Sequence, residues 1–227
     1  MFPIGDTEIK GARLAVVTIT LVVLNTLVFL YEITLSQPAL EAFYQQWAVV
    51  PAKIMQGQNL ITLLTSMFIH GGWMHLIGNM VFLWVFGDNV EQVLGHVMYL
   101  IFYLAGGLVA SAAHIFFNLG STIPSLGASG AIAAVLGAYI IMFPHSRIRL
   151  LIFTGYGTGI TRASALFFLG VWAVTQFLTG VASLGAPTAQ TTGVAVWAHV
   201  GGFVFGLLIG FLLKSRARNL QFEVERA

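Results

Sequence analysis

The chain has 227 residues, of which 58% are hydrophobic and only 8% are charged, and its mean hydropathy is +0.89. Because soluble globular domains carry about 25% charged residues, this composition excludes a soluble fold and indicates an integral membrane protein. The absence of cysteine excludes disulfides and thiol chemistry. The ten Lys and Arg residues are too few and too clustered to form a nucleic-acid surface.

Six apolar segments come close to the roughly 20 residues that a helix needs to cross a bilayer. We predict helices at residues 14–35, 70–90, 93–117, 127–143, 163–181 and 197–213. The predicted fold class is therefore an all-α membrane protein, a bundle of six transmembrane helices in one domain at 14–213. A short leader at 1–13 and a basic tail at 214–227 flank it. We expect no removable signal peptide, since the leader lacks a cleavage site behind a short apolar core.

The segment at 36–69 mixes apolar and polar residues at short range and contains five glutamines. Such a mixture predicts a long loop with short amphipathic helices at the membrane interface. The remaining connections are predicted as loops, two of them free of charge and one, at 144–162, basic.

The distribution of basic residues predicts how the chain is oriented in the membrane. Basic residues concentrate in the leader, the 144–162 loop and the tail, whereas the loops at 118–126 and 183–196 contain none. With six crossings, the three basic segments lie on one side of the membrane. The positive-inside rule then places both termini in the cytoplasm, and we expect a multi-pass protein of the cell membrane.

This topology brings four polar residues to similar depth. The second, fourth and sixth predicted helices all begin at the outer side. His75 and Asn79 lie near the start of the second helix, Ser129 near the start of the fourth and His199 near the start of the sixth. We therefore expect these side chains to share one level in the outer leaflet.

Ser129 and His199 have two interpretations each. A serine among glycines can serve close helix packing alone, and an intramembrane histidine can simply be hydrogen-bonded inside the bundle. Together they can act as nucleophile and general base, because a serine hydroxyl needs a base and imidazole titrates near neutral pH. Ionisable groups at membrane depth are costly, which favours the functional interpretation.

Small residues recur at each turn of the two helices that carry Ser129 and His199. The rows are Ser129, Ala133 and Gly137 on one helix, and Gly202, Gly206 and Gly210 on the other. Such rows let helix backbones approach closely, so we expect the serine and the histidine to come within hydrogen-bond reach. Packing alone would also be compatible with these rows.

Acyl transfer needs donors for a developing oxyanion. His75 and Asn79 are four residues apart and share one helix face, and the Ser129 amide is free at a helix N-terminus. Asn79 could instead make an interhelical hydrogen bond. His70 is expected to structure the loop.

No carboxylate is predicted near His199, so the pattern is a dyad rather than a triad. The histidines also lack acidic or cysteine partners, and we expect neither a metal nor another cofactor.

These residues resemble the motifs of the rhomboid intramembrane serine proteases. The matching stretches are His75-x-x-x-Asn79, Gly127-x-Ser129-Gly130 and Ala198-His199-x-Gly201-Gly202. The resemblance implies a serine endopeptidase with Ser129 as nucleophile and His199 as general base. It implies that His75, Asn79 and the Ser129 amide line the oxyanion hole, with Gly127 beside them. It also implies single-pass transmembrane protein substrates with helix-weakening residues, and gating by the fifth helix and the last outer loop.

The sequence departs from the family at two points. Many members carry a Trp-Arg pair in the first loop, where this chain has Gln58-Asn59-Leu60. Some members place a tyrosine one turn after the serine, against the histidine ring, where this chain has Ala133. We therefore expect the first loop to be anchored, and His199 to be held, by other residues.

Two alternatives to the protease remain open. One is a catalytically silent protein of the same fold that binds transmembrane clients. The other is a small transporter with polar residues at the midplane, although the polar motif residues gather near one face instead. As partners we expect single-pass transmembrane protein substrates and the lipid bilayer, and no nucleic acid.

Overall fold

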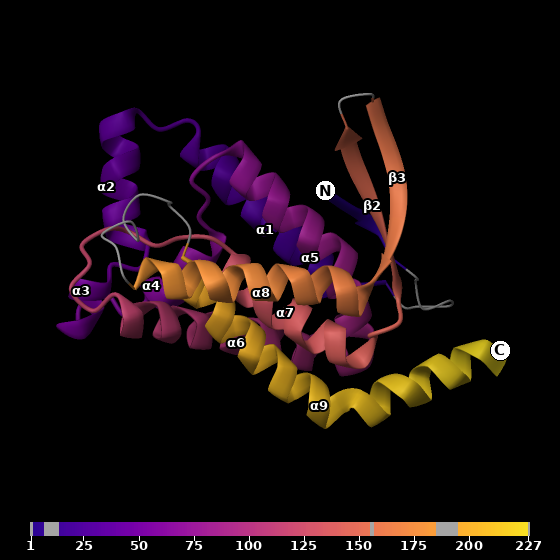
Figure 1. Cartoon of the computed structure of the whole chain (residues 1–227). Coiled ribbons are helices and arrows are strands. Elements are labelled where there is room, and N and C mark those ends of the chain that lie inside the picture. The colour runs from indigo at the N-terminus through magenta and orange to yellow at the C-terminus, as the bar shows by residue number, and fades with distance from the viewer. Residues whose placement is uncertain (1, 7–13, 155–156, 185–194, 227) are drawn as a thin grey trace.

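A computed structural model describes residues 2–6, 14–154, 157–184 and 195–226. It is mostly helical (Figure 1). Within the described residues, the six longest helices are α1 (Val16–Glu32), α5 (Trp73–Leu94), α6 (His96–Phe117), α7 (Ser129–Met142), α8 (Ala165–Ser183) and α9 (Val196–Arg226). They overlap the six predicted segments, although α5 continues past the predicted end at Val90 and α9 continues past Leu213.

Three of the described helices, α6, α8 and α9, are long and apolar enough to cross a membrane, and α1 and α7 are shorter apolar helices. Together with the composition, these helices identify a membrane protein. Between α1 and α5 the chain forms short helices: α2 (Gln37–Trp47), α3 (Pro51–Met55), α4 (Thr62–Thr65) and η1 (Ser66–Phe68). Short helices were predicted for this stretch, and their place at the membrane interface stays a prediction.

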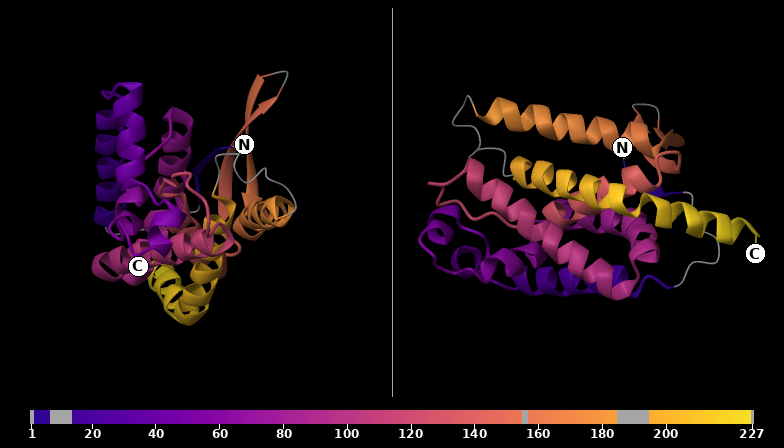
Figure 2. Two further views of the ribbon diagram at one scale, coloured as in Figure 1. Left: turned by 90° about the vertical axis from the view of Figure 1, so that its left-hand side faces the viewer. Right: turned by 90° about the horizontal axis from the view of Figure 1, so that it is seen from below.

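The molecule has two distinct ends. Helices α2 and α3 lie at one end of the bundle, and the C-terminus and a β-hairpin lie at the other (Figures 1 and 2). We call them the α2 end and the hairpin end. The predicted leader is described only at residues 2–6, and residues 185–194 of the predicted loop at 183–196 lie outside the described residues.

The segment 144–162, predicted as a loop, instead contains most of a β-hairpin. Strands β2 (Arg147–Thr154) and β3 (Gly157–Ser164) pair antiparallel, and β1 (Phe2–Gly5) joins β2 to make a three-stranded sheet in the order β1-β2-β3. The helical bundle therefore carries a small sheet at its hairpin end. Apolar Ile148 and Leu150 alternate with arginines and are 0% and 2% exposed. This two-residue period is the signature of a half-buried strand.

Hydrogen bonds tie β1 to the bundle. The Tyr139 hydroxyl on α7 donates to the Asp6 carboxylate and lies 2.8 Å from the Ser146 hydroxyl. The Asn89 side-chain amide on α5 donates to the same carboxylate at 2.9 Å. This network joins the residues after β1, the end of α7 and the α5 helix, and it holds the sheet against the hairpin end.

A second carboxylate joins α1 to α5. Glu91 accepts hydrogen bonds from the backbone amides of Val17 and Thr18 at 2.9 and 2.8 Å and from the Thr18 hydroxyl at 2.7 Å. The first amides of a helix have no partner within the helix and favour negative charge. Glu91 supplies that charge, which explains how a carboxylate is accommodated at 1% exposure.

Helix α7 occupies the centre of the bundle. Twelve of its 14 residues are buried, and it is apolar on all sides, as a helix enclosed by other helices should be. Helix α8 is the opposite case, with three buried residues out of 19. Ser129 therefore begins the most enclosed of the long helices.

The glycine row on α9 allows α9 to pack directly on the backbone of α7. A Cβ atom added at Gly202 would strike the carbonyl oxygen of Gly130, and one at Gly206 would strike that of Ala134. One added at Gly210 would lie 2.9 Å from the oxygen of Ala138. The predicted close approach of the two backbones is confirmed.

This contact predicts a large difference between two glycine substitutions. Gly206→Ala is expected to lower the free energy of unfolding by about 1–3 kcal/mol, because the new methyl group would overlap a backbone carbonyl that cannot rotate away. Gly170→Ala on α8 is the matched control. Nothing lies within 4 Å of its added Cβ, so its stability should be unchanged or slightly raised. The two variants are compared by thermal unfolding in the same detergent. Equal unfolding midpoints for Gly206→Ala and Gly170→Ala would contradict the contact between the two backbones.

Candidate active site

Ser129 and His199 form a hydrogen bond. Ser129 is the first residue of α7, and His199 lies in the first turn of α9. The imidazole Nε2 is 2.7 Å from the Ser129 Oγ. The direct backbone packing of α7 on α9 brings the two side chains to this distance, and a serine hydroxyl hydrogen-bonded to an imidazole is the arrangement that activates a serine nucleophile.

The other imidazole nitrogen contacts a residue that the sequence reasoning missed. The Nδ1 of His199 is 2.7 Å from the side-chain oxygen of Gln176 on α8. Trp172, one turn earlier on α8, places its ring 5.8 Å from the imidazole, centroid to centroid. These two residues hold the ring where Ala133 offers no aromatic contact. Carboxylates are the usual orienting partners of a catalytic histidine, and the available signal for Gln176 was its position as a lone amide in an apolar segment.

Gly127 allows close contact between His75 and the start of α7. Gly127 has φ +126°, a conformation that other residues rarely adopt, and an added Cβ would lie 2.8 Å from Nε2 of the His75 ring. The Nδ1 of His75 accepts a hydrogen bond of 3.4 Å from the Gly71 amide. Nε2 is then the protonated nitrogen of the neutral ring, and this donor lies beside Gly127 and Ser129.

Asn79 adds a second potential donor. It lies one turn after His75 on α5 and is 7% exposed. Its side-chain Nδ2 is buried and has no hydrogen-bond partner among the described residues. Such an unpaired buried donor is uncommon, and each case calls for an explanation. A ligand oxygen at this place would supply the missing partner.

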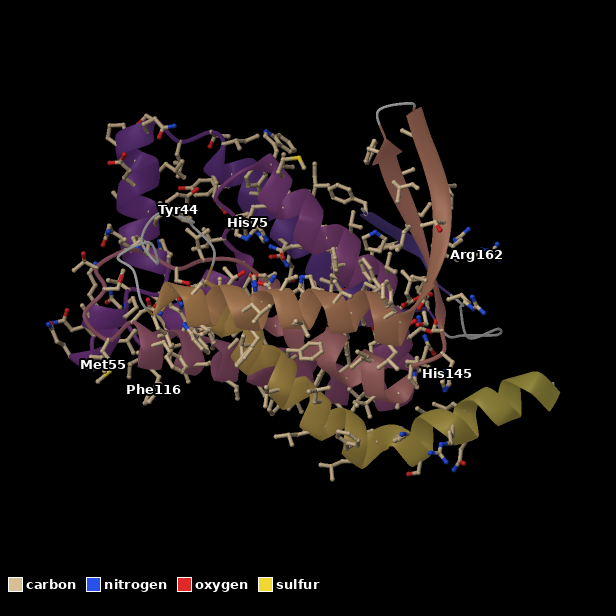
Figure 3. All side chains as sticks on the ribbon, in the orientation of Figure 1. Tyr44, Met55, His75, Phe116, His145 and Arg162 are labelled. Carbon is tan, nitrogen blue, oxygen red and sulfur yellow. The ribbon has the colours of Figure 1, made fainter. Side chains whose placement is uncertain are left out.

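All four predicted polar residues line one cavity. Its volume is about 1040 Å³, and its walls include His75, Asn79, Ser129 and His199. Residues 118–121 and 123–126, from the connection between α6 and α7, also line it. Figure 3 shows His75 between the α5 helix and the interior of the bundle, whereas Phe116 and Met55 point outward at the α2 end. The four motif residues thus share one cavity, and their common depth in a membrane stays a prediction.

His70 acts through its backbone. Its amide donates to the Glu32 carboxylate at 3.1 Å, and the Tyr44 hydroxyl lies 3.4 Å from the same carboxylate. Burial, and then the nearby Glu32 charge, raise the pKa of Tyr44 to about 12, so its hydroxyl stays protonated and can donate. These contacts join α1, α2 and the start of α5, as expected of a residue that structures the loop.

Backbone hydrogen bonds anchor the first loop to the loop before α7. Val49 and Ser125 exchange amide-to-carbonyl bonds of 2.9 and 2.7 Å, and the Gly127 amide donates to Ser66 at 2.9 Å. The last bond fixes the glycine that packs against His75. This chain therefore anchors the first loop through main-chain hydrogen bonds.

Among the residues that the structure describes, no group of three or more His, Cys, Asp or Glu side chains could hold a metal ion.

Comparisons with known proteins agree with these motifs. A family model described as Rhomboid domain matches residues 57–216. The chain is 33% identical over 171 residues to Rhomboid protein 1, mitochondrial, of Saccharomyces cerevisiae, covering 71% of this chain and 45% of the relative. It is 32% identical over 177 residues to RHOMBOID-like protein 7 of Arabidopsis thaliana, covering 78% and 50%.

A bacterial relative carries a protease name. The chain is 31% identical over 162 residues to Rhomboid protease GluP of Bacillus subtilis, covering 66% of this chain and 31% of that protein. The matched region thus spans 31% to 50% of the length of these three relatives. Since the family match covers more than half of the sequence and includes every motif described above, the chain belongs to the rhomboid family.

Proposed function

We propose that this protein is an intramembrane serine endopeptidase that cleaves transmembrane segments of other proteins. The observation that carries the proposal is the 2.7 Å hydrogen bond between Ser129 and His199 at the wall of a large cavity. The name of the Bacillus subtilis relative supports the same chemistry at the level of the family.

The reaction begins with attack on the peptide bond. The Ser129 oxygen adds to the carbonyl carbon while its proton passes to Nε2 of His199. The carbon–nitrogen bond then breaks, and the amine leaves with the proton from Nε2. A water molecule next gives a proton to Nε2 and attacks the acyl ester. Ser129 leaves as the alcohol and regains its proton, so the dyad is restored.

His75 and Asn79 would stabilise the oxyanion. In each tetrahedral step negative charge develops on the carbonyl oxygen, and preorganised donors lower its energy. The unpaired Asn79 Nδ2 and the His75 Nε2 are two such donors, and the Ser129 amide at the start of α7 is a third. Gly127 lets them converge because it has no side chain.

The cavity would admit the water that hydrolysis needs. Helix α7 has 14 residues, so it is about 21 Å long and shorter than a hydrocarbon core of about 30 Å. Ser129 would then lie below the membrane surface, at a depth where bulk lipid excludes water. A substrate helix must unwind there, because its backbone is otherwise fully hydrogen-bonded. Substrates with glycine or proline near the cut would unwind most easily.

The proposed topology has all six long helices crossing the membrane. The basic hairpin and the end of α9 would lie in the cytoplasm, and the cavity would open toward the outer side. The choice of the cell membrane remains part of the proposal, since the yeast relative is named mitochondrial, whereas the other two relatives above come from a plant and a bacterium.

A fluorophosphonate probe tests the proposal without knowledge of the substrate. The intact protein in detergent micelles should be labelled covalently, and peptide mapping should find the adduct on Ser129. Ser129→Ala should remove the label. Ser111→Ala serves as the matched control, because Ser111 lies on α6 beside the small cavity behind Ser129 and should leave labelling intact. Absence of Ser129-dependent labelling in the folded protein would favour a catalytically silent client-binding protein.

A further inference from the structure

The imidazole of His199 is held from two sides. In the described region its hydrogen bonds go to Ser129 on α7 and to Gln176 on α8. Both measure 2.7 Å between heavy atoms. The serine bond alone would leave the ring free to turn about that contact, whereas two bonds on opposite nitrogens fix the plane of the ring.

The partner at Nδ1 also decides where the proton of the neutral ring resides. The tautomer of a histidine is set by the hydrogen bond that its other nitrogen makes. The Gln176 oxygen can only accept, so it requires the proton to be on Nδ1. Nε2 then presents a lone pair to the Ser129 hydroxyl. Only this tautomer can take the serine proton.

Helix α8 presents two contacts to the ring from one face. Trp172 and Gln176 are four residues apart and therefore neighbours on the helix surface. The Trp172 ring lies 5.8 Å from the imidazole and 5.9 Å from the Phe203 ring, one turn further along α9. The α7 position that could have supplied an aromatic contact is Ala133, which is fully buried against the α9 backbone.

We propose that Gln176 is the positioning residue of the dyad, fixing both the plane and the tautomer of the His199 imidazole from α8. This inference rests on the proposed protease function, to which it adds a third functional side chain. Gln176 does not contact substrate in this role and acts through His199. A neutral amide here performs the orienting part of the task that a carboxylate performs in a catalytic triad.

Gln176→Leu tests the role, because leucine is similar in size and lacks the acceptor. With a reporter transmembrane substrate, kcat and the rate of fluorophosphonate labelling should both fall by about 10- to 100-fold, while KM stays unchanged. The matched control is Thr179→Val. Thr179 is exposed on the same helix, and its hydroxyl donates to the backbone carbonyl of Thr175 one turn earlier. The control should keep the rates of the unaltered protein.

Gln176→Glu separates positioning from mere packing. A carboxylate also accepts from Nδ1, so it should restore kcat relative to Gln176→Leu. Its negative charge favours the protonated imidazole, which cannot act as a base. The acid limb of the pH–rate profile should therefore move to higher pH. The size of this shift reports contact with the ring, because a carboxylate hydrogen-bonded to Nδ1 raises the imidazole pKa more than a charge that makes no contact with it.

Failure of the positioning role and failure of the protease proposal would give different experimental results. If the unaltered protein is labelled at Ser129 and Gln176→Leu is labelled equally fast, the positioning role is wrong and the protease proposal stands. If the unaltered protein is not labelled, the protease proposal fails. Nitrogen-15 NMR of the His199 ring then still reports the tautomer. A proton on Nδ1 that moves to Nε2 in Gln176→Leu would support the positioning role, and an unchanged tautomer would overturn it.

Discussion

Ser129→Ala is expected to reduce cleavage of a reporter transmembrane substrate by roughly 10⁴-fold or more. The variant removes the only atom that forms the acyl ester, and methyl replaces hydroxyl without adding bulk. His199→Ala should cause a loss of similar size, because the serine then loses the base to which it is hydrogen-bonded. The two losses should not add in the double variant, since nucleophile and base act as one unit.

The measurement is the rate of cleavage in proteoliposomes with equal amounts of folded protein. Ser111→Ala and Ser183→Ala are suitable controls, since both replace a serine on a helix, and Ser183 bonds only its own backbone at Gly180. Turnover by Ser129→Ala above the rate of a protein-free blank would refute the assignment of the nucleophile.

Asn79→Ala is expected to lower kcat by about 10²- to 10³-fold, the size of effect that follows loss of one oxyanion donor. KM should change little, because the donor acts on charge that develops only in the transition state. The buried Nδ2 of Asn79 has no hydrogen-bond partner among the described residues, so the stability of the fold should not fall with the rate.

Asn25→Ala provides the comparison for Asn79. Asn25 is a buried amide on α1 whose Nδ2 donates to the Leu21 carbonyl at 2.7 Å. Loss of this hydrogen bond in Asn25→Ala should lower the stability of the fold modestly and leave kcat unaltered. An Asn79→Ala variant that cleaves at the normal rate would remove Asn79 from the oxyanion hole.

The long helices and the proximity of Ser129 to His199 could be predicted from the sequence, because both depend on simple periodicities. Apolar runs of transmembrane length located the long helices. The small residues at every turn of the segments around Ser129 and Gly202 predicted that two backbones would touch, and this contact brings the serine to the histidine.

The sequence did not predict the hairpin at 147–164, because its charge density suggested a loop. The alternation of arginine with Ile148 and Leu150 was the available signal. Gln176 was missed for a different reason. Its contact with His199 depends on how α8 is rotated and placed against α9, and a helix with so few buried residues carries little pattern that fixes its rotation.

The enclosure of α7 by other helices has a consequence for how changes in the bilayer affect Ser129. Because α6, α8 and α9 have many exposed side chains while 12 of the 14 residues of α7 are buried, we expect a change in bilayer thickness or fluidity to reach Ser129 only by displacing the neighbouring helices. We therefore expect contacts with the neighbouring helices, rather than contacts with lipid, to determine the depth of Ser129 in the membrane. In deuterated buffer the amides of α7 should be among the slowest to exchange, and those of α8 among the fastest of the long helices.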